Sequence, residues 1–253
     1  MDDPRALFDL TGRVACITGA SSGLGRRAAV ALAAAGAQVV GVARRMDALE
    51  ELRAEIGDRC AVMVADVADR EGIKALQLGV SAPFGAPDIV VHAAGVNTRQ
   101  AADDVTPDGW DATLALNLSA PFFLSQALVP AMKAKGWGRI VNFASLQSTR
   151  AFPASIAYGA SKGGVAQLTR AMAEAWSRDG ITANAIGPGF FPTELTQVVF
   201  SDTERAARNA AQTCAGRNGT LQDMDGPLLF LCSDASAYVT GQVIMVDGGF
   251  TAK

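Results

Sequence analysis

The stretch Arg13–Gly25 (RVACITGASSGLG) decides the fold. It joins a short apolar run, Arg13–Thr18, to a glycine-rich turn and to a helical pattern over Leu24–Ala35. Glycines at a strand-to-helix junction allow a tight turn and let backbone N–H groups approach a phosphate at the helix N-terminus. The spacing G-x-x-x-G-x-G differs from the commonest dinucleotide fingerprint and lacks the Lys-Ser/Thr of a P-loop. The turn therefore indicates either a dinucleotide site or an ordinary glycine-rich turn, and it disfavours NTP hydrolysis.

Short apolar runs recur along the chain, with helical patterns between them. They are not cleanly alternating, and they cover Arg13–Thr18, Gln38–Ala43, Cys60–Val64, Asp88–His92, Arg139–Phe143, Thr182–Ile186 and Val243–Val246. Such runs are typical of central strands in a parallel sheet that is covered on both faces. The alternation of strands and helices predicts one open, doubly wound α/β domain over residues 1–253. In such folds ligands bind beyond the carboxyl ends of the strands.

Composition and charge exclude several function classes. The 253 residues are 49% hydrophobic and 19% charged, with a net charge of −3, so nothing indicates the basic face of a nucleic-acid partner. The single histidine, His92, excludes zinc catalysis through several His ligands, and we expect no metal site. The four cysteines form no C-x-x-C pair, and no window reaches about 18 uninterrupted apolar residues. We therefore expect a cytoplasmic protein with free thiols and no membrane partner.

The residues about 20 positions beyond the glycine turn indicate which dinucleotide would bind. The second apolar run ends at Ala43, and Arg44 and Arg45 follow. An acidic residue here would bind the ribose hydroxyls of NAD, whereas arginine meets the 2′-phosphate of NADP. Ser22 is placed to add a hydrogen bond to the same phosphate. The pair favours NADP over NAD, because guanidinium groups are strong partners for phosphate; the alternative is a solvated pair at a helix start.

A second signal is Tyr158-Gly159-Ala160-Ser161-Lys162, in a stretch that is predicted to be a long helix over Ser155–Trp176. Residues four apart share one helix face, and a nearby ammonium lowers the pKa of a phenol. Tyrosine can then act as general acid or base without histidine. Ser145 follows a predicted strand, and Asn117 stands in a helical stretch although asparagine is a weak helix former. Each residue alone has an ordinary structural explanation, but their order after the glycine turn indicates a catalytic site.

From about Leu10 to Gly249 the chain resembles the short-chain dehydrogenase/reductase family. The motifs that carry the resemblance are Thr18–Gly25, Asp66 in VADV, HAAG at His92–Gly95, Asn117, Ser145, Tyr158–Lys162, NAIGPG at Asn184–Gly189, Thr193 and VDGG at Val246–Gly249. The resemblance implies a single Rossmann-type domain with a seven-stranded parallel sheet, usually assembled as a homotetramer. It also implies an NAD(P)-dependent oxidoreductase that interconverts a secondary alcohol and a ketone.

The resemblance implies roles for the matched residues. Tyr158 would be the general acid/base, Ser145 would orient the substrate oxygen, and Asn117 would hold a water of a proton relay. Lys162 would bind the nicotinamide ribose and lower the pKa of Tyr158. The expected cofactor contacts are Gly19, Ser21, Ser22, Gly23, Leu24, Gly25, Arg44, Arg45, Asp66, Val67, His92, Ala93, Ala94, Gly95, Tyr158, Lys162, Pro188, Gly189 and Thr193. The family usually has asparagine at His92, which places this histidine on the adenosine side or makes it a packing residue at a strand end.

The substrate side is the least readable part of the chain, and residues 190–211 are predicted to form a lid. Its motifs are most similar to the sugar-acid branch of the family, gluconate 5-dehydrogenases and 2-deoxygluconate 3-dehydrogenases. The candidate substrate contacts are Arg99, Gln147, Phe190, Phe191 and Glu194. Arg99 either pairs with a substrate carboxylate or is a solvated loop charge. Two alternatives stay open: a 3-oxoacyl thioester (acyl-carrier-protein) reductase, which shares every catalytic motif, and a catalytically silent dinucleotide-binding scaffold or sensor.

Overall fold

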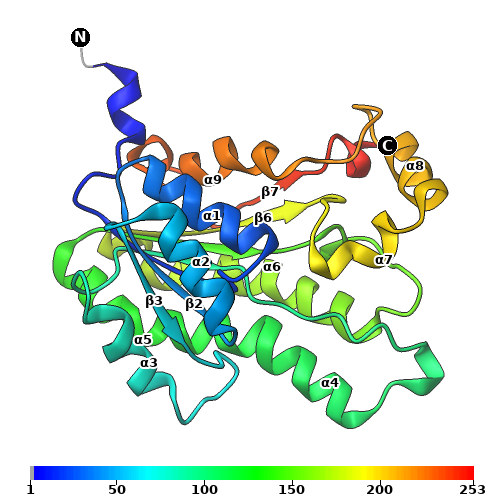
Figure 1. The fold of residues 1–253 in the computed structure, drawn as a ribbon, viewed down its shortest axis with the longest axis horizontal. Coiled ribbons are helices and arrows are strands. Elements are labelled where there is room, and N and C mark those ends of the chain that lie inside the picture. Colours follow the sequence, from blue (N-terminus) through cyan, green and yellow to red (C-terminus); the bar gives the residue numbers. More distant parts are fainter. Residues whose placement is uncertain (1–2) are drawn as a thin grey trace.

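A computed structural model describes residues 3–253, and Met1 and Asp2 of the predicted domain lie outside the described residues. Seven parallel strands form one sheet in the order β3-β2-β1-β4-β5-β6-β7 (Figure 1). The strands are β1 (Val14–Thr18), β2 (Gln38–Ala43), β3 (Cys60–Val64), β4 (Ile89–His92), β5 (Gly138–Phe143), β6 (Ile181–Pro188) and β7 (Val243–Val246). The predicted α/β fold with seven parallel strands is confirmed. The order runs outward in both directions from β1 and β4, so a crevice is expected where the carboxyl ends of these two strands meet.

Helices cover both faces of the sheet. They are α1 (Gly23–Ala34), α2 (Met46–Ile56), α3 (Ile73–Ser81), α4 (Pro107–Leu114), α5 (Ala120–Lys135), α6 (Ile156–Trp176), α7 (Gln197–Phe200), α8 (Thr203–Gln212) and α9 (Asp225–Cys232). In Figure 1, α1 and α9 lie on one side of the sheet and α3 and α5 on the other. The two short helices α7 and α8 extend beyond the end of β6, at one end of the molecule (Figure 1).

The first strand shows why its sequence is apolar at every position. Ala15 and Ile17 belong to the core under α1 and α9, whereas Val14 and Cys16 belong to the core under α3 and α5. Successive side chains of a strand point to opposite faces, so a strand that is covered on both faces buries all of them. All five residues of β1 are buried. The short non-alternating runs therefore follow directly from the two-sided packing.

The sixth strand is longer than the sequence predicts. The predicted strand Thr182–Ile186 extends from Ile181 to Pro188, because Gly187 and Pro188 still pair with Met245 and Val246 of β7. Glycine and proline weaken a strand pattern in the sequence. Here they form the end of the strand, from which the chain enters the predicted lid.

One helical stretch among residues 3–253, Pro107–Lys135, is long and apolar enough to cross a membrane by length and composition alone, with a mean hydropathy of 1.4. It comprises α4, a π-helical turn and α5, and it packs against α3, β5 and α6. Only 44% of its most apolar window is buried. The stretch is thus a helical layer that packs within this domain.

A buried carboxylate ties three elements together at the amino end of the sheet. Asp88, which is 3% exposed, accepts a hydrogen bond from the backbone N–H of Val14 at 2.9 Å. Its second oxygen lies 2.6 Å from the ammonium of Lys135, which in turn donates to the carbonyl of Ala86 at 3.0 Å. One side chain thus joins the starts of β1 and β4 to the end of α5.

Replacing Asp88 with Ala leaves a buried N–H and an ammonium without their acceptor. We expect Asp88→Ala to lower the free energy of unfolding by about 2–4 kcal/mol, because loss of one partner exposes the desolvation cost of the others. Denaturant unfolding checks this. Asp103→Ala, at an exposed position, is the matched control, and equal losses for both variants would contradict the account.

Candidate active site

A cavity of about 720 Å³ lies beyond the carboxyl ends of the strands. It is lined by the turn after β1, the ends of β2 and β4, the segments after β5 and β6, one face of α6 and part of α8. Every site residue that the sequence predicts lines this cavity except His92 and Asn117. Among residues 3–253, no group of three or more His, Cys, Asp or Glu side chains is placed to hold a metal.

The turn after β1 has no room for side chains at two positions. Gly19 has a positive φ of 70°, and a Cβ there would lie 2.7 Å from the backbone nitrogen of Ala94. A Cβ on Gly25 would lie 2.3 Å from the carbonyl oxygen of Gly19. The turn is thus pressed against the end of β4, and the N-terminus of α1 opens directly into the cavity. This cradle fits the phosphates of a dinucleotide, which backbone N–H groups at a helix N-terminus bind.

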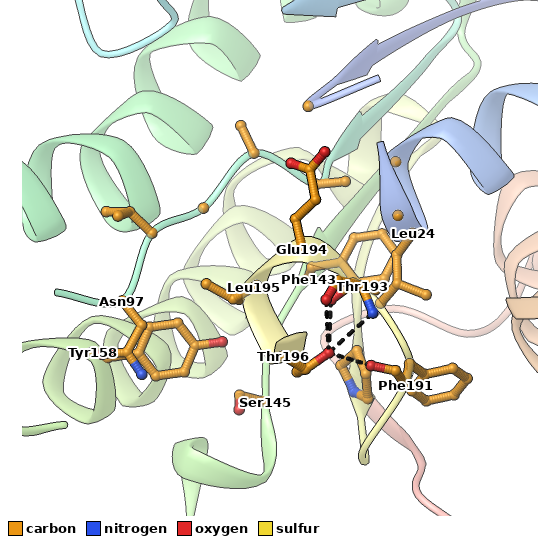
Figure 2. A pocket seen from close by; sticks show the side chains of 18 of the residues that line it. Leu24, Asn97, Phe143, Ser145, Tyr158, Phe191, Thr193, Glu194, Leu195 and Thr196 are labelled. Carbon is orange, nitrogen blue, oxygen red and sulfur yellow. Dashed lines mark hydrogen bonds between the residues drawn. The ribbon is translucent and has the colours of Figure 1, made fainter. Parts of the chain in front are cut away.

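Tyr158 and Ser145 meet on one side of the cavity. Tyr158 lies in the first turn of α6, and Ser145 precedes a short 3-10 turn after β5 (Figure 2). Burial raises the pKa of the Tyr158 phenol, whereas a hydrogen bond with Ser145 and the positive charge of Arg99 act in the opposite direction. The pKa of this phenol therefore moves the other way from the sequence prediction, because desolvation outweighs the groups that favour the phenolate.

Lys162 lies one helical turn after Tyr158 and is 5% exposed. Its ammonium donates to the carbonyl of Phe143 at 2.6 Å and lies 5.6 Å from the ring centre of Tyr158. Burial lowers the pKa of Lys162 to about 8. The expected juxtaposition of the two side chains is present, but Lys162 is not among the groups that lower the pKa of Tyr158.

Asn117 lies behind the cavity wall, in a π-helical turn over Ala115–Ser119. Its side chain accepts from the N–H of Val96 at 2.9 Å and donates to the carbonyl of Val96 at 2.9 Å and to Ser161 at 3.0 Å. A Cβ on Gly95 would lie 3.4 Å from the Asn117 oxygen and 3.9 Å from the Lys162 nitrogen. The π turn explains the helix irregularity in the sequence, and such turns are frequent at functional sites. Asn117 thus clamps the loop after β4 beside Lys162.

His92 is turned away from the cavity. It is 3% exposed, its Nε2 lies 2.8 Å from the hydroxyl of Ser125 in α5, and burial lowers its pKa to about 3. Its side chain is therefore a neutral packing group at the end of β4. The His92 side chain does not reach the cavity where a cofactor contact was expected. It fits the alternative expectation, a packing residue at a strand end.

The two arginines after β2 have different surroundings. Arg44 is 75% exposed at its side chain and lies 3.9 Å from Asp66. Arg45 forms hydrogen bonds with both carboxylate oxygens of Glu194, at 2.9 and 3.0 Å, and with the hydroxyl of Ser21 at 3.0 Å. Figure 2 shows Glu194 pointing away from Tyr158 and Ser145. Glu194 lines the cavity, and its carboxylate is paired with the arginine that follows Arg44, a pairing that sequence patterns do not reveal. Its role as a substrate contact stays a prediction.

The substrate side of the cavity combines aromatic rings with polar groups. Phe190 and Phe152 both line it, with ring centres 6.3 Å apart, and Phe250 stands 5.7 Å from Phe190. The guanidinium of Arg99 donates to the carbonyl of Leu195 at 2.7 Å. Buried amide atoms of Gln147 and Asn209, the Oε1 and the Nδ2 respectively, have no protein partner.

Sequence reasoning missed Phe152, Arg205 and Asn209 among the residues that line this side. Arg205 and Asn209 are four residues apart in α8, a spacing that places them on one helix face. That spacing was the available signal. The sequence does not show that this face of α8 turns toward the cavity, because the long segment between β6 and α8 sets its direction.

Comparison with known proteins agrees with this geometry. A family model described as enoyl-(acyl carrier protein) reductase matches residues 19–251. A gluconate 5-dehydrogenase from Gluconobacter oxydans is 37% identical over 250 residues, which cover 98% of each chain. The 3-oxoacyl-[acyl-carrier-protein] reductase of Escherichia coli is 34% identical, over 96% of this chain and 98% of that protein.

A solved structure of a gluconate 5-dehydrogenase from Burkholderia cenocepacia, in complex with NADP and tartrate, superposes with a TM-score of 0.92. It is 38% identical and the match covers 98% of both chains. Identity at this level over nearly the whole length, together with the glycine cradle and the Ser145–Tyr158–Lys162 cluster, establishes the family. The chain belongs to the short-chain dehydrogenase/reductase family and is an NAD(P)-dependent oxidoreductase that acts on CH–OH groups.

Proposed function

We propose that this enzyme oxidises one secondary hydroxyl of a sugar acid of the gluconate type to a ketone, reversibly, with NADP as the hydride acceptor. The observation that carries the proposal is one continuous cavity. It joins the glycine cradle and Arg44 to Ser145, Tyr158 and the cation Arg99. The similarity to a gluconate 5-dehydrogenase along the whole chain supports the same substrate class.

Tyr158 moves the proton. In the oxidation direction its phenolate accepts the proton of the substrate hydroxyl, while Ser145 donates a hydrogen bond to the same substrate oxygen. NADP, when bound in this cavity, would supply the nicotinamide that accepts the hydride from the carbinol carbon. In the reverse direction the phenol returns the proton to the carbonyl oxygen. With its only histidine buried on Ser125, the chain has a tyrosine in the place of the usual imidazole.

Lys162 and Asn117 support the proton path. We propose that the Lys162 ammonium, which is held at the carbonyl of Phe143, binds the nicotinamide ribose. Asn117 then stabilises the loop next to that ammonium and holds a water through which the proton reaches solvent. Its hydrogen bonds with Val96 and Ser161 support this position.

The cofactor assignment rests on charge at the end of β2. Arg44 is largely exposed and its nearest carboxylate, Asp66, is 3.9 Å away, so its guanidinium is available to a 2′-phosphate. Asp66 and Val67 would face the adenine, with Pro188, Gly189 and Thr193 on the nicotinamide side, since all of them line the cavity.

The substrate assignment rests on the polar groups opposite Tyr158. Arg99 would bind the carboxylate, and the unpartnered amide atoms of Gln147 and Asn209 would bind hydroxyl groups of a polyhydroxylated chain. A polar site of this kind suits a sugar acid better than the acyl chain of a 3-oxoacyl thioester. The silent-scaffold alternative is disfavoured, because Ser145, Tyr158 and Lys162 come together in one cavity.

We also propose a cytoplasmic homotetramer with residues 190–211 as its substrate lid. The four unpaired cysteines support a reducing compartment. Light scattering of the purified enzyme measures the assembly directly.

Removing the Tyr158 hydroxyl tests the mechanism. We expect Tyr158→Phe to lower kcat by about 10²- to 10⁴-fold, the usual contribution of a general acid or base. Cofactor binding, followed by nicotinamide fluorescence, should persist because the ring remains. Full activity in this variant would overturn the mechanism.

The pH dependence has a definite sign. Oxidation needs the phenolate of Tyr158, so its kcat/KM should rise with pH through the pKa of that phenol, and ketone reduction should fall over the same range. Since a hydrogen bond with Ser145 lowers this pKa, Ser145→Ala should shift the rising limb to higher pH, besides slowing turnover. If the rising limb of the pH profile does not shift, a group other than Tyr158 controls the pH dependence.

Arg99 tests the substrate class. Losing a charge-assisted hydrogen bond of about 1.5–3 kcal/mol should raise KM for gluconate by about 10- to 100-fold in Arg99→Ala. The KM of an uncharged polyol should stay nearly constant, since it has no carboxylate. Equal increases for both substrates would refute the pairing.

A further inference from the structure

The lid is fastened to the cofactor side by one ion pair. Glu194, which precedes the lid helices α7 and α8, receives a two-pronged hydrogen bond from the guanidinium of Arg45, at 2.9 and 3.0 Å. Both side chains are partly exposed, 51% for Arg45 and 60% for Glu194. The pair connects residues that are 149 positions apart in the sequence.

The carboxylate of Glu194 lies among groups that suit a phosphate. The same guanidinium also donates to the hydroxyl of Ser21 at 3.0 Å, and the hydroxyl of Ser22 hydrogen-bonds the Glu194 carboxylate. These two serines belong to the turn after β1, and Arg45 is the second residue after β2. The Glu194 carboxylate thus lies where two hydroxyl groups and a guanidinium group converge. The same set of donors is suited to a phosphate.

The guanidinium of the neighbouring Arg44 is not held by a close carboxylate. Arg44 has only the distant Asp66, at 3.9 Å, whereas both prongs of Arg45 are already used. A 2′-phosphate that reaches the two arginines can bind Arg44 at once. To bind Arg45 as well, it has to displace the lid carboxylate.

We propose that Glu194 is a specificity-determining residue for the cofactor: its carboxylate competes with the 2′-phosphate for Arg45, Ser21 and Ser22. This inference rests on the proposed use of NADP. Binding of the phosphorylated dinucleotide releases the lid from the glycine turn, whereas the unphosphorylated one leaves the ion pair in place.

Release of Glu194 also reaches the substrate side. Leu195, the next residue, accepts a hydrogen bond at its carbonyl from the guanidinium of Arg99 at 2.7 Å. A side chain hydroxyl, that of Thr196, closes this turn onto Phe191 and Thr193 (Figure 2). Because the turn is short and internally bonded, movement of Glu194 shifts the acceptor of Arg99. The 2′-phosphate thereby influences the cation that faces the substrate.

Nucleotide fragments test the competition without turnover. Calorimetry on the full-length enzyme measures Kd for 2′,5′-ADP and for 5′-AMP, which differ only in the 2′-phosphate. We expect Glu194→Gln to lower the Kd for 2′,5′-ADP by about two- to fivefold, the range of one partly exposed charge pair. Affinity for 5′-AMP should not change. Tightening of both fragments alike would assign the competition to the 5′-phosphate, and no tightening would overturn the proposal altogether.

The matched control is Glu204→Gln. It removes the same charge from the same lid, but Glu204 pairs only with Arg208 at 3.5 Å. If both variants bind 2′,5′-ADP more tightly by the same factor, the loss of one negative charge from the lid explains the effect and the proposal fails. In an Arg45→Ala background the effect of Glu194→Gln should vanish, because the two side chains act through one contact.

Hydrogen exchange gives a second readout. In the wild-type enzyme, the backbone amides of residues 193–212 should exchange faster with 2′,5′-ADP bound than with 5′-AMP bound. In Glu194→Gln the same amides should exchange fast with either fragment bound. Equal wild-type affinities for the two fragments would contradict the proposed NADP preference alone. The ratio of the Kd values of wild-type and Glu194→Gln enzyme for 2′,5′-ADP tests the competition separately. A failure of the proposed NADP preference can therefore be told apart from a failure of the proposed competition.

Discussion

The close backbone contact between Gly19 and Ala94 is the constraint on which the rest of the site depends. It exists because β1 and β4 are neighbours in the sheet although 70 residues separate them, with Thr18 paired to His92. Only a residue without Cβ allows this approach at a φ of 70°. The contact brings the N-terminus of α1 next to the loop after β4. From there the ends of β5 and β6 and the first turns of α6 complete one cavity.

Burial governs the chemistry in that cavity. Desolvation disfavours the charged forms of both Tyr158 and Lys162, which raises the pKa of the phenol and lowers that of the ammonium to about 8. Ser145 and Arg99 then favour the phenolate, and Asn117 keeps the neighbouring loop in place through the π turn. The protonation of Tyr158 and Lys162 is thus governed by desolvation, and for Tyr158 also by two polar neighbours.

Much of the fold could be predicted from the sequence, because a strand that is covered on both faces has an unmistakable apolar run. The predicted strands agree within about two residues. The largest difference is at β6, which is extended by pairing with β7 that no local pattern shows. The glycine turn and the Tyr158–Lys162 spacing likewise depend on local order. The partners of His92 and Glu194 could not be predicted for the opposite reason: Ser125 and Arg45 are distant from them in the chain. The direction of the pKa of Tyr158 also needed the structure, since spacing to Lys162 says nothing about burial.

The most direct test of the central claim compares substrates by nicotinamide absorbance on one enzyme preparation. Initial rates are measured for gluconate-type sugar acids with NADP, for a 3-oxoacyl thioester with NADPH, and for simple secondary alcohols. The account predicts that a sugar acid is oxidised with the highest kcat/KM, because Arg99, Gln147 and Asn209 then have partners. Turnover of the thioester without any turnover of a sugar acid would contradict it.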